Sequence, residues 1–79
     1  MDFLGNHIEA LVFCSEKPIK IEELKSCMSE MFEADVPEKD ILTALNRIEE
    51  KYADDQYPFT IIKSGGGYHF LTKSAYQAS

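Results

Sequence analysis

The strongest constraint on the fold is a repeat of apolar residues in the second half of the chain. The repeat advances by steps of four, three and four residues, and it consists of Ile41, Leu45, Ile48 and Tyr52, with Leu42 beside them. Residues at this spacing lie on one face of an α-helix. The pattern therefore predicts an amphipathic helix, the third of three, with its apolar face buried in a small domain.

Two further helices are predicted before it. The first runs from about Asp2 to Ser15 and carries an apolar stripe at helical spacing. The stripe consists of Leu4, Ile8, Leu11 and Val12. Phe3, His7 and Phe13 lie outside it, so this helix has apolar bulk on more than one side. Pro18 ends the helix because proline disfavours a helical conformation in the residue before it.

A short extended piece, Pro18 to Ile21, leads into the second predicted helix, Glu22 to Phe32. The expected buried face of this helix consists of Leu24, Cys27, Met28 and Met31. Lys20 stands at the N-cap position, where Ser, Thr, Asp or Asn would satisfy a free N–H group. The start of the second helix is therefore predicted to be weak.

The third helix is predicted to begin near Asp35 to Pro37. Asp35 and Glu38 have the spacing of a capping box, and Pro37 suits a position in the first turn. The polar segment from Asp54 to Pro58 closes the helix.

Two strands, Phe59 to Lys63 and Gly67 to Thr72, are predicted around a Ser64-Gly65-Gly66 turn. Glycine supplies the positive φ that a tight hairpin turn needs. This pairing sets Ile61 opposite Phe70 and Ile62 opposite His69. One face of the hairpin then carries Phe59, Ile61, Tyr68 and Phe70. The other carries Ile62 and Leu71, so we expect a second contact there, within the domain or with a partner.

The order helix, short strand, two helices and hairpin predicts an α+β winged helix-turn-helix with a C-terminal β-hairpin wing. Residues 1–79 are predicted to form one domain. No apolar run approaches the roughly 20 residues of a membrane span, and the N-terminus lacks a secretory signal. Cys14 and Cys27 are expected to be buried thiols in a reducing compartment, which indicates a cytoplasmic protein.

Charge argues against nucleic acid as the partner. The segment that would enter DNA in a winged helix, Glu38 to Asp55, holds six acidic and three basic residues, and the whole chain has a formal net charge of −6. Such a segment repels phosphates, so the fold is predicted to serve protein contacts. The alternative is a DNA-binding regulator that reads bases with Asn46 and Arg47 and contacts phosphates with Lys63 and Lys73.

No pattern indicates catalysis or a cofactor. The glycines after Lys63 lead from strand to strand, whereas a phosphate-binding loop leads from a strand into a helix. His7, Cys14, Cys27 and His69 lack the close ligand pairs of a structural zinc site. Solvated helix faces account for most of the acidic residues. The chain is therefore predicted to be no enzyme and to hold no metal or cofactor.

Two motifs resemble the family of segregation and condensation protein B. Residues 8–13 (I-E-A-L-V-F) and 18–24 (P-I-K-I-E-E-L) are similar to its opening helix and the segment after it. Residues 66–73 (G-G-Y-H-F-L-T-K), followed by Tyr76, are similar to its hairpin. The chain departs from the family pattern at Lys20, at His69 and in the longer link from Met31 to Glu38.

The resemblance implies the first winged-helix domain of a longer protein with two such domains. Proteins of this family join a kleisin subunit and a structural-maintenance-of-chromosomes ATPase in chromosome condensation and segregation, and the first domain is associated with homodimerisation. We therefore expect a non-catalytic scaffold module that forms a homodimer. The expected dimer surface consists of Phe3, His7, Phe13, Ile62, His69 and Leu71.

Overall fold

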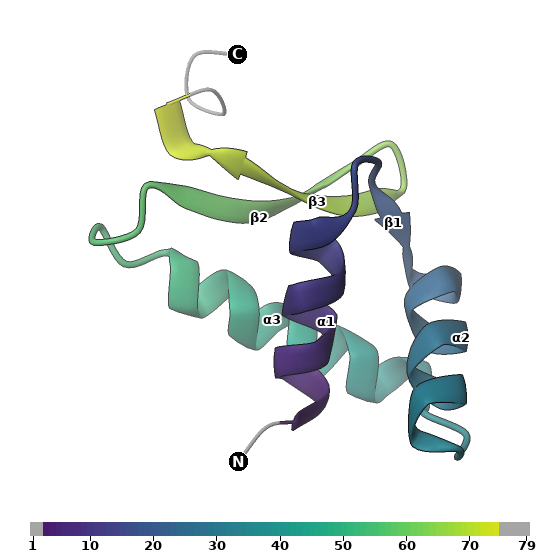
Figure 1. Cartoon of the computed structure of the whole chain (residues 1–79). Helices are drawn as coiled ribbons and strands as arrows, with labels where there is room; N and C mark the ends of the chain where they lie inside the picture. The colour runs from purple at the N-terminus through teal and green to yellow at the C-terminus, as the bar shows by residue number, and fades with distance from the viewer. Residues whose placement is uncertain (1–2, 75–79) are drawn as a thin grey trace.

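Three helices lie against one side of a small antiparallel sheet in the computed structural model, which describes residues 3–74 (Figure 1). The elements in chain order are α1 (Phe3–Cys14), β1 (Ile19–Lys20), α2 (Ile21–Phe32), α3 (Glu38–Tyr52), β2 (Phe59–Ser64) and β3 (Gly67–Thr72). This arrangement confirms the predicted α+β winged helix. Tyr76, which belongs to the hairpin motif, lies outside the described residues.

The core gathers around α3, as its repeat predicted. The apolar face of α3 is buried at Ile41, Ala44, Leu45, Ile48 and Tyr52. The other elements contribute a few side chains each, namely Ile8, Val12, Ile19, Leu24, Met28, Val36, Ile61 and Tyr68. Leu4 and Leu11 of the predicted α1 stripe pack at the margin of this core. One helix face thus organises the whole domain.

The sheet has the strand order β1-β3-β2, with both pairs antiparallel. Ile61 pairs with Phe70 and Ile62 with His69, which confirms the predicted register. Gly65 and Gly66 occupy the turn with φ angles of 60° and 82°. Positive φ at both central residues is the mark of a type I′ turn, whose twist suits a two-residue hairpin.

The predicted buried face of α2 is only half right. Leu24 and Met28 are fully buried, but Met31 is 54% exposed and Cys27 is also exposed. Cys27 precedes Met28 by one residue, about 100° around the helix, and so leaves the buried row. Met31 lies in the last turn of α2. Cys14, at the end of α1, is exposed too, so the prediction of two buried thiols was wrong.

The predicted cap of α3 was also wrong. Pro37 is the N-cap residue and no side chain caps the helix. The carboxylate of Asp35 instead accepts a hydrogen bond from Lys25 Nζ at 2.9 Å. At the start of α2, the side chain of Lys20 makes no cap bond, and the Lys20 backbone N–H donates to Glu23 Oε1 at 3.0 Å.

Candidate protein-interaction surfaces

The first candidate surface joins one side of α1, from Phe3 to Leu11, to the C-terminal half of α2. Phe3 is 58% exposed, and its carbonyl oxygen accepts a hydrogen bond from His7 Nδ1 at 2.6 Å. The His7 ring packs edge-on against Phe32, with ring centroids 5.4 Å apart. Farther along, Leu11 faces Cys27 and Met31 across a hollow of about 370 Å³. We call this set the α1–α2 patch: Phe3, His7, Leu11, Cys27, Met31 and Phe32.

The patch contains residues that the sequence reasoning missed. Met31 and Phe32 are 54% and 39% exposed and were not expected at an interface. A large exposed apolar patch on a small protein marks an interaction site, and methionine adapts well to varied partners. Spacing gave no signal for Met31, which follows Leu24 by seven residues and so lies about 20° from it around the helix.

Phe13, the third predicted α1 residue, lies away from this patch. It stands at the C-terminal end of α1, where its ring centroid is 6.3 Å from that of Phe59 and 5.8 Å from that of Phe70. Although it touches the hairpin, Phe13 is 63% exposed. It borders a groove of about 420 Å³ between α1, the end of α3 and β2.

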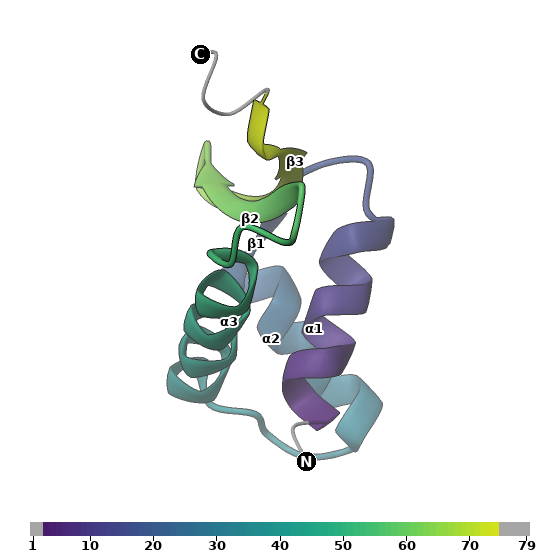
Figure 2. The same cartoon turned by 90° about the vertical axis from the view of Figure 1, so that its left-hand side faces the viewer.

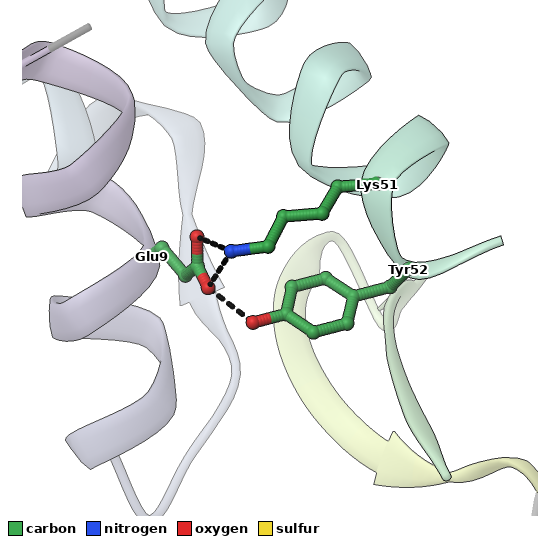
Figure 3. A network of polar contacts seen from close by, with 3 residues as sticks. All are labelled: Glu9, Lys51 and Tyr52. Atoms are coloured by element: carbon green, nitrogen blue, oxygen red, sulfur yellow. Dashed lines mark hydrogen bonds and ion pairs between the residues drawn. The ribbon is translucent and has the colours of Figure 1, made fainter. Parts of the chain in front are cut away.

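Polar contacts hold α1 and α3 together beside this groove (Figure 3). The Glu9 carboxylate accepts hydrogen bonds from Lys51 Nζ, at 3.2 and 3.4 Å, and from the Tyr52 hydroxyl. The bond to Glu9 is the main cause that raises the pKa of Lys51. Burial, followed by the bond to Glu9, raises the pKa of Tyr52. At neutral pH both side chains therefore keep their protons and donate hydrogen bonds to the Glu9 carboxylate.

The remaining predicted interface residues meet on the outer face of the wing. Ile62 and His69 are cross-strand partners, and Leu71 lies opposite Thr60 on the same face. All are half-buried. This face points away from the helices, because Ile61 and Tyr68 carry the buried side of the hairpin. The structure therefore distributes the six predicted residues over the α1–α2 patch, the Phe13 groove and the wing.

The residues of the DNA alternative do not form a basic surface. Asn46 and Arg47 lie on the exposed side of α3, and Lys63 is exposed on β2. Lys73 Nζ donates a hydrogen bond to the backbone oxygen of Asp54 at 2.8 Å. All the acidic residues between 38 and 55 are exposed, namely Glu38, Asp40, Glu49, Glu50, Asp54 and Asp55. The potential over α3 is thus unfavourable for phosphates.

The described residues, 3–74, show neither a cluster of metal ligands nor a membrane-spanning helix. No group of three His, Cys, Asp or Glu side chains in this range is arranged to hold a metal ion. None of the helices in the same range has both the length and the apolar character needed to cross a membrane.

Comparison with known proteins gives one family. The sequence profile described as "Segregation and condensation complex subunit ScpB" matches residues 6–79. No curated protein sequence gives a significant match.

Solved structures share the fold. A conserved hypothetical protein from Chlorobium tepidum is 27% identical, with a TM-score of 0.70 over 95% of this chain and 44% of that chain. A dimer of ScpB N-terminal domain complexed with ScpA peptide gives a TM-score of 0.77 at 13% identity, over 94% and 82%. ScpB from Mycobacterium tuberculosis gives 0.72 at 16% identity, over 98% and 44%. This chain thus spans less than half of the Chlorobium and Mycobacterium chains.

Proposed function

The chain belongs to the family of segregation and condensation complex subunit ScpB, and on this premise we propose that it is a non-catalytic scaffold module that forms a homodimer. The observation that carries the proposal is the exposed α1–α2 patch. Its aromatic and methionine side chains have no counterpart on the outer side of α3, which is acidic. A domain with these surfaces is suited to bind protein and to repel nucleic acid.

The α1–α2 patch is the proposed dimer surface. A two-fold dimer uses the same self-complementary surface on both copies, and one compact apolar patch meets that requirement. Phe3 and His7 of the sequence-based set belong to it. Phe13, Ile62, His69 and Leu71 lie elsewhere, so we propose that they contact other subunits. A dimer in the solved structure of the ScpB N-terminal domain with ScpA peptide supports self-association.

The partners follow from the family. We propose that the domain takes part in chromosome condensation and segregation in the cytoplasm, at the nucleoid, by joining a kleisin subunit and a structural-maintenance-of-chromosomes ATPase. We also propose that it is the first of two winged-helix domains in a longer protein. In support, it covers 82% of an isolated ScpB N-terminal domain but only 44% of ScpB from Mycobacterium tuberculosis.

A sedimentation concentration series, run with and without a short mixed-sequence DNA duplex at near-physiological salt, tests this proposal. We expect a dimer that ignores the duplex. Binding that weakens as salt is added, and that is lost in Arg47→Ala, would instead support the DNA-binding regulator. A monomer at every concentration would contradict the dimer.

Matched variants locate the surface. Met31→Glu places a charge in the α1–α2 patch, and we expect it to give a monomer with unchanged helical circular dichroism. Leu42→Glu is the control, because Leu42 is also an exposed apolar residue of a helix, 38% exposed, but lies on α3. We expect it to leave the dimer intact. Equal effects of the two substitutions would exclude the patch as the dimer surface.

A further inference from the structure

The outer edge of the sheet is a free strand. With the strand order β1-β3-β2, β3 is central and β2 has no neighbour on its far side among the described residues. Figure 2 shows β2 at the margin of the sheet, above α3, with β3 on its other side. An unpaired edge exposes backbone donors and acceptors that can pair with another chain.

The register identifies which backbone groups are free. The Lys73 N–H donates to the Pro58 carbonyl at 2.8 Å, which makes Pro58 and Lys73 a hydrogen-bonded pair. Bonded and non-bonded pairs alternate along an antiparallel ladder, so the even-numbered residues of β2 bond to β3. The N–H and C=O groups of Phe59, Ile61 and Lys63 therefore point outward. Their spacing of two residues matches one face of an added strand.

A groove runs beside this edge. It has a volume of about 360 Å³ and lies between the C-terminal turns of α3 and β2. Its lining consists of Glu49, Tyr52, Ala53, Asp55, Thr60, Ile61, Ile62 and Lys73. The small side chain of Ala53 leaves room on the helix side. The free backbone groups thus adjoin a space that can take side chains of an added strand.

The charge of the groove selects its occupant. Glu49 and Asp55 are exposed, and neither forms an ion pair within residues 3–74. Lys73, the groove's one basic residue, donates to the backbone of Asp54. The negative charge of Glu49 extends to the sheet, because it adds to burial in raising the pKa of Tyr68. An incoming strand therefore meets negative charge on its helix-facing side beside Phe59 and Ile61, whereas Lys63, on the same face near the turn, is positively charged.

We propose that the β2 edge binds an extended segment of a partner protein that adds antiparallel to β2 and carries lysine or arginine at the alternate positions opposite Phe59 and Ile61. Its backbone bonds to Phe59, Ile61 and Lys63, and its basic side chains face Glu49 and Asp55. A second copy of this chain is the less favoured occupant, because each copy carries a formal net charge of −6. This site is separate from the α1–α2 patch and does not depend on the dimer.

Two capped octapeptides test the site. One alternates lysine with threonine and the other alternates glutamate with threonine. We expect only the lysine peptide to bind, to shift the backbone amide NMR signals of Phe59, Ile61 and Lys63, and to slow their hydrogen exchange. No binding, equal binding of both peptides, or shifts confined to α1 and α2 would overturn the proposal.

Backbone methylation tests the added strand. In an antiparallel pair the residues opposite Ile61 share its face and form the backbone bonds. N-methylation at the lysines should therefore weaken binding about tenfold, whereas N-methylation at the threonines should have little effect. Equal effects of the two methylated peptides would show that the edge is not used.

A charge-matched pair of variants tests the groove. Glu49→Gln with Asp55→Asn should weaken binding of the lysine peptide about fivefold at low salt. Glu38→Gln with Asp40→Asn makes the same change in net charge at the other end of α3 and should leave the affinity unchanged. Equal weakening by both pairs would mean general charge attraction and would overturn the site. Self-association is measured separately, so either proposal can fail alone.

Discussion

Glu9 on α1 and Lys51 on α3 lie 42 positions apart in the sequence, and Lys51 Nζ donates to Glu9 Oε1 at 3.2 Å. The Tyr52 hydroxyl donates to the same carboxylate oxygen. One acidic side chain therefore holds two neighbouring residues of α3 and fixes the angle at which α1 crosses it. The Glu9 side chain is only 19% exposed, so little water competes for these bonds.

This network predicts a loss of stability at alkaline pH. The pKa values of Lys51 and Tyr52 are raised above their ordinary values of 10.5 and 10.0, so the folded chain holds both protons more tightly than the unfolded chain. Their contribution is complete at neutral pH and is lost as the pH rises through the raised pKa values. We expect the free energy of unfolding, measured in urea, to begin to fall at about pH 10 and to go on falling as the pH rises through the raised pKa values.

Tyr52→Phe isolates this contribution. It should lower the free energy of unfolding at neutral pH by about 1 kcal/mol, because the Glu9 carboxylate loses one donor. The alkaline decline should become shallower. Tyr57→Phe is the control, since Tyr57 packs against Tyr52 but makes no hydrogen bond to Glu9 among residues 3–74. The same pH profile in both variants would rule out the network as its cause.

Gly67 predicts a second effect on stability. A Cβ atom at this position would lie 2.7 Å from Pro18 Cβ and 2.9 Å from the Pro18 carbonyl carbon. Gly67→Ala must therefore push β1 away from β3, and we expect thermal unfolding to show a cost of about 1–3 kcal/mol. Gly65→Asn should cost little, because asparagine tolerates the positive φ of a type I′ turn. If Gly67→Ala left the stability unchanged, β1 could move away from β3 at little cost in free energy.

Ser29 connects α2 to the segment before α3. Its Oγ accepts a hydrogen bond from the partly buried Val36 N–H at 3.0 Å. Ser29→Ala leaves that N–H without a partner and should cost about 1–2 kcal/mol in chemical unfolding. Ser26→Ala, at an exposed position of α2, is the control. It brings the same gain in helix propensity as Ser29→Ala and should not lower the free energy of unfolding.

The ion pair beside it should matter less. The side chains of Lys25 and Asp35 are 37% and 84% exposed, so solvent screens their attraction. Asp35→Asn should therefore change the free energy of unfolding by less than about 0.5 kcal/mol. If Asp35→Asn lowered the free energy of unfolding more than Ser29→Ala does, the ion pair would matter more than the Ser29 hydrogen bond, contrary to this prediction.

The wing gives a prediction about the dimer. Ile62 is half-buried on the outer face of the sheet, whereas Phe3 lies at the end of α1 that is remote from the sheet (Figure 1). A two-fold contact centred on the α1–α2 patch does not reach that face. Ile62→Glu should therefore leave both the dimer and the helical circular dichroism unchanged. If this variant sedimented as a monomer, the outer face of the wing would belong to the dimer surface after all.

Much of the fold followed from local patterns. The α3 repeat, the two glycines of the turn and the alternation in β2 and β3 each depend on neighbours a few residues away. The hairpin register was correct because a two-residue turn determines which residues face each other. Lys20 was recognised as a poor N-cap from its side chain alone.

The errors have one cause. The cap assigned to Asp35 and the burial assigned to Cys27 and Met31 were local expectations that distant residues overrode. The Asp35 carboxylate accepts a hydrogen bond from Lys25 instead of capping α3, and only Leu24 and Met28 of the expected α2 face are buried in the core. Propensity and periodicity describe which face of an element is apolar, and not how much of that face its neighbours cover.

The sequence by itself determined the order of the elements, the apolar face of α3, the hairpin turn and the acidic character that disfavours DNA. These depend on side-chain type and on short spacing. Only the tertiary structure decided which apolar residues stay exposed, that Glu9 reaches Lys51 and Tyr52, and that the free edge of β2 lies beside Glu49 and Asp55. Each of these joins residues far apart in the chain, so it depends on how whole elements pack.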